Sequence, residues 1–197
     1  MQQRKIIIGT RGSELARWQT DYIAQRLRSL EPKLNVETIV IKTTGDKILD
    51  SPLSKIGDIG LFTKEIEKAL QDEAIDLAVH SLKDVPTVLP EGLEIGAITE
   101  REDIRDVFIS NPRKKYKSLR DVPNGGSIAT GSLRRKCQLL NYRPDLSIID
   151  IRGSLRTRRE KLENSDWDGM ILAKAGVTRL GWADIISETF SPSKLSH

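Results

Sequence analysis

The sequence predicts an α/β fold of two lobes, each a mostly parallel sheet flanked by helices. Short apolar segments of strand length alternate along the 197 residues with amphipathic segments of helix length, a pattern typical of parallel sheets covered by helices. The alternation restarts after the charged run at 100–103, so we expect domain 1 at 1–100 and domain 2 at 101–197. Hydrophobic residues make up 38% of the chain and charged residues 30%, which suits a folded protein with an apolar core.

The first lobe is expected to contain two helices and four strands. Ser13 can cap a helix in which Tyr22, Ile23 and Leu27 keep an apolar face, and Pro32 ends that helix. A second helix is expected at 62–70. The expected strands are 5–9, 36–42, 76–81 and 93–99.

The second lobe repeats the alternation. Its expected strands are 106–110, 127–130, 147–151 and 170–174, and its expected helices are 133–141 and 155–163. Ligands of such folds bind at the carboxyl ends of the strands, and a cleft between two lobes is a favoured place for them.

Four polar or glycine-containing segments directly follow predicted strands. Turns from strand to helix present backbone N–H groups and a helix N-terminus, which favour anions. An arginine in such a turn can bind a carboxylate or phosphate through two N–H groups. The four segments together indicate a site for a ligand with many negative groups; they are 10–13 (TRGS), 80–86 (HSLKDVP), 130–135 (TGSLRR) and 152–158 (RGSLRTR).

One carboxylate, Asp84, stands out among these cations. It follows Lys83 after a predicted strand and precedes Pro86, which favours a loop over a helix at this point. Two interpretations stay open. Asp84 is either a structural partner in an ion pair or a carboxylate that stabilises a cationic intermediate and moves protons.

The other reactive side chains form no familiar catalytic or metal-binding pattern, and no metal is expected. His80 and His197 are far apart in the sequence and have no cysteine or carboxylate spacing suited to a metal. We expect His80 to be a hydrogen-bonded core residue and Cys137, within an expected helix, to be an inert, half-buried thiol. The sequence lacks a P-loop, a G-x-S-x-G segment and a complete G-x-G-x-x-G segment.

The net charge of +4 is spread unevenly, with many cations between residues 101 and 179. Such a basic half suits nucleic acid, phosphate or a polycarboxylate, although solvated cations on helix faces explain most clusters of this kind. Nucleic acid is disfavoured because aromatic residues total 5% and the cations lie in separate turns. No apolar run is long enough to span a membrane, and residues 1–9 do not resemble a signal peptide. The single cysteine indicates the cytoplasm.

Several segments resemble the signature segments of the hydroxymethylbilane synthases, also called porphobilinogen deaminases. The segments occur in that family's order across nearly the whole chain, so the resemblance is specific. They are GTRGSELARWQ, KTTGDKILDSPLSKIGDIGLFTKEIEKAL, DLAVHSLKDVPTVLPEGLEIGAITEREDIRDVFIS, GSLRRKCQLLNYRPDL, IRGSLRTRREKL and ILAKAGVTRLG.

The resemblance implies a transferase of haem and porphyrin biosynthesis. Such an enzyme joins four porphobilinogen molecules head to tail into a linear tetrapyrrole and releases ammonia. The resemblance also implies a dipyrromethane cofactor, held through a thioether by a cysteine of a third domain. Two lobes like those of periplasmic binding proteins are expected to enclose this cofactor, and a full-length member is expected to be monomeric.

The resemblance further implies the roles of individual residues. Asp84 is expected to be the catalytic carboxylate that assists loss of the substrate's amino group and stabilises the resulting azafulvene cation. Arginines suit the remaining contacts because every added pyrrole brings two more carboxylates. The expected cofactor contacts are Lys83, Ser132, Arg134, Arg135, Arg152 and Arg158, and the expected substrate contacts are Arg11, Ser13, Lys55, Phe62 and Arg179.

The chain departs from the family pattern in several places. Ile59 stands where a basic residue is usual, Gly131 replaces the first of two serines, and Ser154 replaces an asparagine. We expect the third domain to be absent, and Cys137 is not the cofactor cysteine. The chain is therefore expected to be inactive alone, to have an incomplete first domain, and to tend to self-associate through an exposed strand edge.

A receptor that closes on an anionic ligand without chemistry is the alternative function. Asp84 distinguishes the two, because a binder of carboxylates gains nothing from another carboxylate in its site. An enzyme that forms a cationic intermediate does gain from one.

Overall fold

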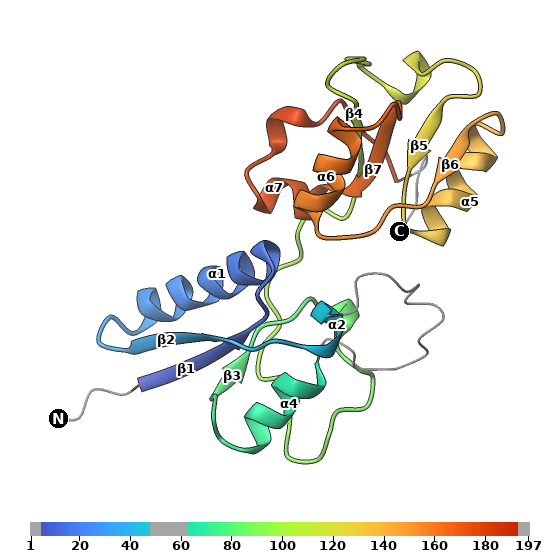
Figure 1. Cartoon of the computed structure of the whole chain (residues 1–197). Coiled ribbons are helices and arrows are strands. Elements are labelled where there is room, and N and C mark those ends of the chain that lie inside the picture. Colours follow the sequence, from blue (N-terminus) through green and yellow to red (C-terminus); the bar gives the residue numbers. More distant parts are fainter. Residues whose placement is uncertain (1–4, 48–62, 193–197) are drawn as a thin grey trace. The chain divides into compact units, whose positions relative to one another are not determined.

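The computed structural model describes residues 5–47 and 63–192 (Figure 1). The chain divides into two compact units, Met1–Ile98 and Thr99–His197, and each is described by itself below. Among the described residues, no helix is both long enough and apolar enough to cross a membrane.

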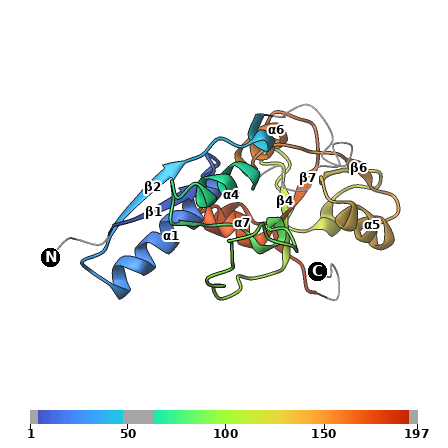
Figure 2. The same cartoon turned by 90° about the horizontal axis from the view of Figure 1, so that it is seen from below.

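The first unit is built on a parallel sheet of three strands in the order β2-β1-β3. These strands are β1 (Lys5–Thr10), β2 (Asn35–Val40) and β3 (Leu77–Ala78). Helix α1 (Glu14–Leu30) runs along β1 and β2, as both cartoon views show (Figures 1 and 2). Its Ala24 is buried with Ile8 of β1 and Val36 of β2. Helices α2 (Thr44–Lys47) and α4 (Lys64–Gln71) complete the unit, with α4 against β1 and β3.

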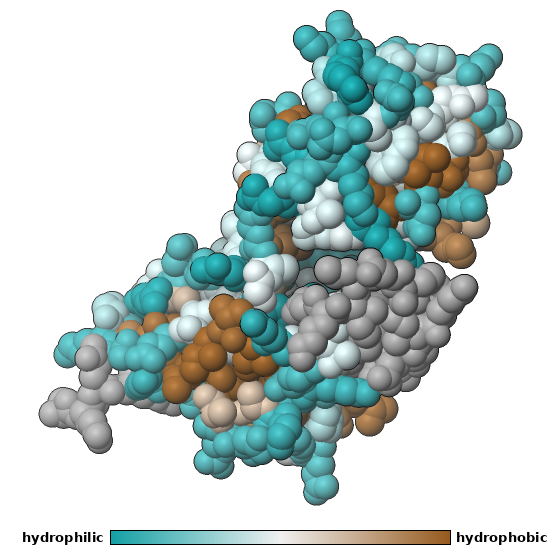
Figure 3. All heavy atoms as spheres, viewed as in Figure 1, coloured by the Kyte–Doolittle hydropathy of each residue, from teal (hydrophilic) through white to brown (hydrophobic). Residues whose placement is uncertain are grey.

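Two strand predictions for the first unit were wrong: the strand at 76–81 is shorter than expected, and the strand at 93–99 does not form. The strand expected at 76–81 is confined to β3. Just before β3, the Asp76 carboxylate accepts the N–H of Ile7 at 2.6 Å, and the Asp76 N–H donates to the Ile7 carbonyl at 2.9 Å. No strand forms at 93–99. Apolar residues alternate there, but Ile95 and Ile98 are exposed and are not packed into the core of the unit. Figure 3 shows apolar surface over the strands of this unit, where Ile39 and Val40 of β2 are about half exposed.

The second unit has a five-stranded sheet in the order β6-β5-β7-β4-β8. Its strands are β4 (Asp106–Ser110), β5 (Ser127–Ala129), β6 (Ser147–Ile149), β7 (Gly169–Ala173) and β8 (Glu188–Thr189). The β6-β5-β7 part is parallel, whereas β4 runs antiparallel to both β7 and β8. The predicted α/β class is confirmed, and the antiparallel β4 is a feature that the alternation of segments did not predict.

Helices cover both faces of this second sheet. On one face, Phe108, Ile128 and Ile171 pack with Leu139 of α5 (Leu133–Tyr142). On the other face, Val107 and Met170 belong to a cluster that includes residues of α6 (Leu155–Glu163) and α7 (Lys174–Arg179). Neighbouring residues of β4 therefore point into opposite cores, as the pleat of a strand requires.

The direction of β4 decides which residues share an edge of the sheet. Asp106, the first residue of β4, pairs with Ala173, the last residue of β7. Asp106 therefore lies at the edge where β5, β6 and β7 end and where the turns into α5, α6 and α7 begin. Ligands of α/β folds bind at this edge.

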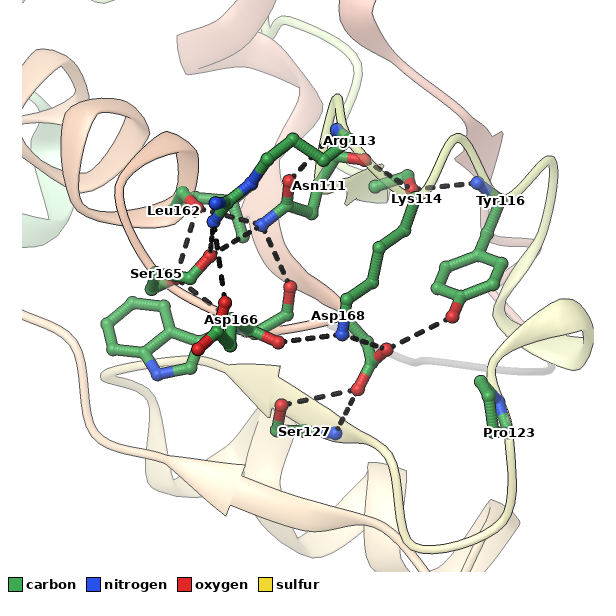
Figure 4. Close-up of polar contacts among 12 residues, drawn as sticks. Asn111, Arg113, Lys114, Tyr116, Pro123, Ser127, Leu162, Ser165, Asp166 and Asp168 are labelled. Carbon is green, nitrogen blue, oxygen red and sulfur yellow. Dashed lines mark hydrogen bonds and ion pairs between the residues drawn. The ribbon is translucent and has the colours of Figure 1, made fainter.

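A polar network holds the opposite edge together (Figure 4). The Asp168 carboxylate accepts from Lys114 Nζ at 2.8 Å, from the Tyr116 hydroxyl at 3.2 Å and from the backbone N–H of Ser127 at 2.7 Å. The Asn111 side chain donates to the carbonyls of Leu162, Ser165 and Trp167, each at 3.0 Å. These contacts tie the loops after β4 and α6 to the start of β5.

Candidate functional site

Three serines cap the helices that follow β1, β5 and β6. The hydroxyl of Ser13 accepts the N–H of Ala16 at 3.3 Å, which confirms the predicted cap of α1. The hydroxyl of Ser132 accepts the N–H of Arg135 at 3.4 Å, and that of Ser154 accepts the N–H of Thr157 at 3.1 Å. Ser154 therefore does the capping that an asparagine also does well.

Glycines allow the two turns of the second unit to approach each other closely. A Cβ atom on Gly131 would lie 2.5 Å from the carbonyl oxygen of Ile151, so a serine does not fit there without movement of backbone. Gly153 has a φ of +113°, in the region that favours glycine. The replacement of a serine by Gly131 thus has a structural reason, which is contact between the β5–α5 and β6–α6 turns.

Two predicted cofactor contacts, Arg134 and Arg135, meet on one buried carboxylate. Nη2 of Arg134 lies 2.9 Å from Oδ2 of Asp106, and Nη2 of Arg135 lies 2.8 Å from its Oδ1. Asp106 is fully buried, whereas the side chains of Arg134 and Arg135 are 34% and 12% exposed. One negative charge faces two positive ones, so the group keeps a net positive charge.

Arg158 and Arg152 add to this positive charge. Burial lowers the pKa of the Arg158 guanidinium, and the charges of Arg135 and Arg152 lower it further, while Asp150 opposes them. Nε of Arg158 donates to the Gly153 carbonyl at 2.9 Å, and Arg152 lies 3.7 Å from Asp150. Arg135 and Arg152 therefore both lie close enough to Arg158 to repel its guanidinium.

The remaining predicted contact of the second unit, Arg179, belongs to a different group. It lies on α7 and forms an ion pair with Glu102 at 3.8 Å. Lys174 of the same helix pairs with Asp103 at 2.9 Å.

The predicted residues of the first unit gather after β1 and β3. Asp84 ends a single turn of 3-10 helix, Leu82–Asp84, and its side chain is 41% exposed, with Lys83 Nζ 3.9 Å away. Burial lowers the pKa of His80; the Asp84 carboxylate opposes this shift and the Arg11 guanidinium adds to it. Arg11, His80 and Asp84 are thus electrostatic neighbours. The predicted contacts Lys55 and Phe62, and the departure at Ile59, lie outside the described residues.

Asp106 is the functional residue that sequence reasoning missed. It is an acid at the start of an apolar strand, DVFIS, directly after a charged run. Its place beside the arginines depends on the antiparallel direction of β4. That direction is not visible in the sequence pattern, although a charged acid that becomes buried needs a cation or a metal as a partner.

Arg134, Arg135, Arg152 and Arg158 form an arginine cluster, and this cluster fits a ligand that carries several carboxylates. Guanidinium groups bind carboxylates through paired N–H donors, and the Nε–H of Arg135 is buried without a hydrogen-bond partner among the described residues. A polycarboxylate would relieve the repulsion of Arg158 by Arg135 and Arg152. A dipyrromethane with acetate and propionate groups is a ligand of this chemistry.

Residues 6–197 match a protein-family model described as porphobilinogen deaminase, dipyromethane cofactor binding domain. The chain belongs to the porphobilinogen deaminase family. Curated family members are 56% identical in Chlorobaculum tepidum and 58% identical in Chlorobium phaeobacteroides, each over 186 residues or 94% of this chain. A third, from Carboxydothermus hydrogenoformans, is 54% identical over 189 residues. The chain spans 58–60% of the length of these porphobilinogen deaminases.

Solved structures show the fold alone. A putative lipoprotein from Actinomyces odontolyticus aligns with a TM-score of 0.51 and 16% identity over 97% of this chain and 79% of its own. The family and the α/β class expected from the sequence are both confirmed. The cofactor that the resemblance implied is also the one in the description of the matching family model.

Proposed function

We propose that this chain supplies the cofactor-binding arginines and the catalytic carboxylate of a hydroxymethylbilane synthase. This transferase joins four porphobilinogen molecules head to tail and releases ammonia, in the biosynthesis of tetrapyrroles. The observation that carries the proposal is the excess of positive charge at this sheet edge, where Arg134 and Arg135 share the single carboxylate of Asp106, in a chain that matches a dipyromethane cofactor binding domain.

Guanidinium groups hold the anionic side groups in this proposal. Arg134, Arg135, Arg152 and Arg158, with Lys83 and Ser132, bind the carboxylates of the dipyrromethane, which when bound supplies the carbon that accepts each new pyrrole. The Ser132 hydroxyl accepts a backbone N–H, so its own proton can be donated to an anion. Ser13 has the same geometry at the start of α1. It is proposed to contact substrate together with Arg11, Lys55, Phe62 and Arg179.

Asp84 acts on the reacting substrate in this proposal. Loss of ammonia from porphobilinogen leaves a cation, and a carboxylate close to that cation stabilises it more than it stabilises the neutral substrate. The Asp84 side chain is part-exposed beside Lys83, so it is accessible to a ligand. Its carboxylate also can accept and return the proton that the leaving amino group requires.

The further properties proposed here follow from composition and charge. A cytoplasmic location suits a chain with one cysteine, Cys137, which is exposed on α5. Small polycarboxylates are preferred over nucleic acid as partners because many cations of the second unit are already paired with acids, as Arg143 is with Asp145 and Lys114 with Asp168.

The test uses the protein encoded by the complete gene. It is incubated with porphobilinogen while ammonia and linear tetrapyrrole are measured. Release of both, at about one ammonia for each porphobilinogen consumed, supports the proposal. Tight binding of porphobilinogen without release of ammonia would instead support the receptor alternative.

A further inference from the structure

The geometry points to Asp106 as a positioning residue that holds the guanidinium groups of Arg134 and Arg135 in place for ligand carboxylates. The identity of the ligand rests on the proposed function. The placement of the two guanidinium groups by Asp106 does not, and it is tested separately below.

The two arginines would not converge without an acceptor between them. Successive residues of an α-helix point about 100° apart around the axis, and Arg134 and Arg135 occupy successive positions in the first turn of α5. Yet each places an Nη2 atom within 2.9 Å of one Asp106 carboxylate, on a different oxygen. The acid lies at the start of β4, 28 and 29 residues earlier in the chain, so it fixes both side chains to the sheet.

The N–H groups that do not bind Asp106 differ between the two arginines. Nη1 of Arg134 donates to Oε1 of Gln138 at 3.0 Å, one turn further along α5. Arg135 is the more buried of the two and keeps a buried Nε–H without an acceptor among the described residues. Asp106 therefore occupies one edge of the Arg135 guanidinium and leaves another donor for a ligand.

Positioning and simple neutralisation predict opposite effects for the same variant. Asp106→Asn removes a negative charge from an anion-binding site, so electrostatics alone predicts tighter binding of a polycarboxylate. If Asp106 positions the arginines, the variant binds more weakly, because the two guanidinium groups lose their common acceptor. The sign of the change decides between the two roles.

The binding experiment titrates the 197-residue chain with a synthetic dipyrromethane that carries acetate and propionate groups. We expect about tenfold weaker binding by Asp106→Asn. The control is Asp103→Asn, which removes an equal charge from the same unit but pairs with Arg105 and Lys174 instead. The control is expected to bind as tightly as the unchanged chain or more tightly. Unchanged or tighter binding by Asp106→Asn would overturn the proposal.

A second readout needs no ligand. The Nη1 and Nη2 signals of an arginine in ¹⁵N NMR spectra report how fast its guanidinium rotates, because they are separate when rotation about the Cζ–Nε bond is slow and merge when it is fast. We expect the signals of Arg134 and Arg135 to indicate slow rotation in the unchanged chain and fast rotation in Asp106→Asn, with Arg143 unaffected. Slow rotation in both proteins would overturn the proposal even if the dipyrromethane binds. If rotation is slow in the unchanged chain and fast in Asp106→Asn, but the unchanged chain does not bind the dipyrromethane, the positioning role is supported and the proposed ligand is rejected.

A second variant covers the case in which Asp106→Asn does not fold. Asp106→Glu keeps the charge and moves the carboxylate by one methylene group. We expect this variant to show faster rotation of both guanidinium groups and weaker binding of the dipyrromethane. Slow rotation with unchanged affinity in Asp106→Glu would contradict the positioning role.

Discussion

Nη2 of Arg135 lies 2.8 Å from Oδ1 of Asp106, a carboxylate that is completely buried at the start of β4. This pair joins the first turn of α5 to β4, which runs antiparallel to both of its neighbours in the sheet. The arginine cluster of the second unit is thus anchored to the sheet and is not a group of solvated surface cations. The predictions below separate the ligand-binding role of this cluster from its structural role.

Replacing Arg158 by leucine should weaken binding of the dipyrromethane about 30-fold, or about 2 kcal/mol, because ligand carboxylates lose a partly buried cation. Isothermal titration calorimetry on the 197-residue chain measures this change. Arg113→Leu is the matched control, since Arg113 lies in the loop after β4 at the opposite edge of the sheet and pairs with Asp166. Equal losses for both variants would mean that only overall charge matters.

Asp84→Asn should leave the fold intact and reduce the turnover of porphobilinogen by about a hundred- to a thousandfold. One electrostatic contact to a developing charge is worth about 3–4 kcal/mol, and an amide cannot supply it. The measurement is the rate of ammonia release by the protein encoded by the complete gene, with circular dichroism as a check on folding. Asp72→Asn, which removes a carboxylate paired with Lys68 in the same unit, should retain full activity. Near-normal turnover by Asp84→Asn would remove this residue from the mechanism.

Gly131→Ser should destabilise the second unit by about 1–3 kcal/mol, the usual cost of excess atoms in a packed place. The added Cβ would meet the Ile151 carbonyl at 2.5 Å, and backbone cannot move aside cheaply. Urea unfolding measures the change in free energy. Gly96→Ser is the control, because no atom lies within 4 Å of a Cβ built at Gly96. A stable Gly131→Ser protein would show that the two turns can separate without cost.

Stability should fall in acid partly through Asp168. Burial opposes ionisation of Asp168, but hydrogen bonds from Lys114 and the Ser127 backbone hold its pKa below the usual value. A carboxylate with a lower pKa in the folded state stabilises fully above its unfolded pKa of about 3.9 and loses that contribution as the pH falls through the folded pKa. The free energy of unfolding should therefore decline from about pH 5 downward.

Asp168→Asn tests this assignment, because the variant removes the titrating group. Its free energy of unfolding should be lower at neutral pH and should depend less steeply on pH below about pH 5. Asp184→Asn, which removes a carboxylate from the short 3-10 turn after α7, should keep the slope of the unchanged chain. An unaltered slope in Asp168→Asn would assign the acid sensitivity to other carboxylates.

The sequence predicted features that depend on neighbouring residues, such as helix caps, better than features that depend on pairing between strands far apart in the chain. Ser13 was expected to cap α1 because serine before an apolar-periodic segment satisfies a free backbone N–H, and the structure shows that cap. The turns after β5 and β6 followed from the same local chemistry. The strand expected at 93–99 does not form. Alternation of side chains indicates which residues could share a face of a strand, but it does not show whether the segment pairs with another strand.

Asp106 shows the second limit of sequence reasoning. The arginines at 134 and 135 were visible as a basic pair in a turn, but their acceptor lies in another segment. Its location required the direction of β4, which depends on packing of the whole second sheet. Sequence reasoning therefore found the two arginines and missed the acid with which they pair.

Arg135 is held at both of its ends, and this has a consequence for the entropy of binding. The Ser132 hydroxyl fixes its backbone N–H, and Asp106 fixes its guanidinium. An arginine side chain carries about 2 kcal/mol of rotamer entropy, and here much of that freedom is lost when the chain folds. A carboxylate that reaches Arg135 would then meet a donor with little freedom left to lose, so its binding would cost less side-chain entropy than binding to an unrestrained arginine.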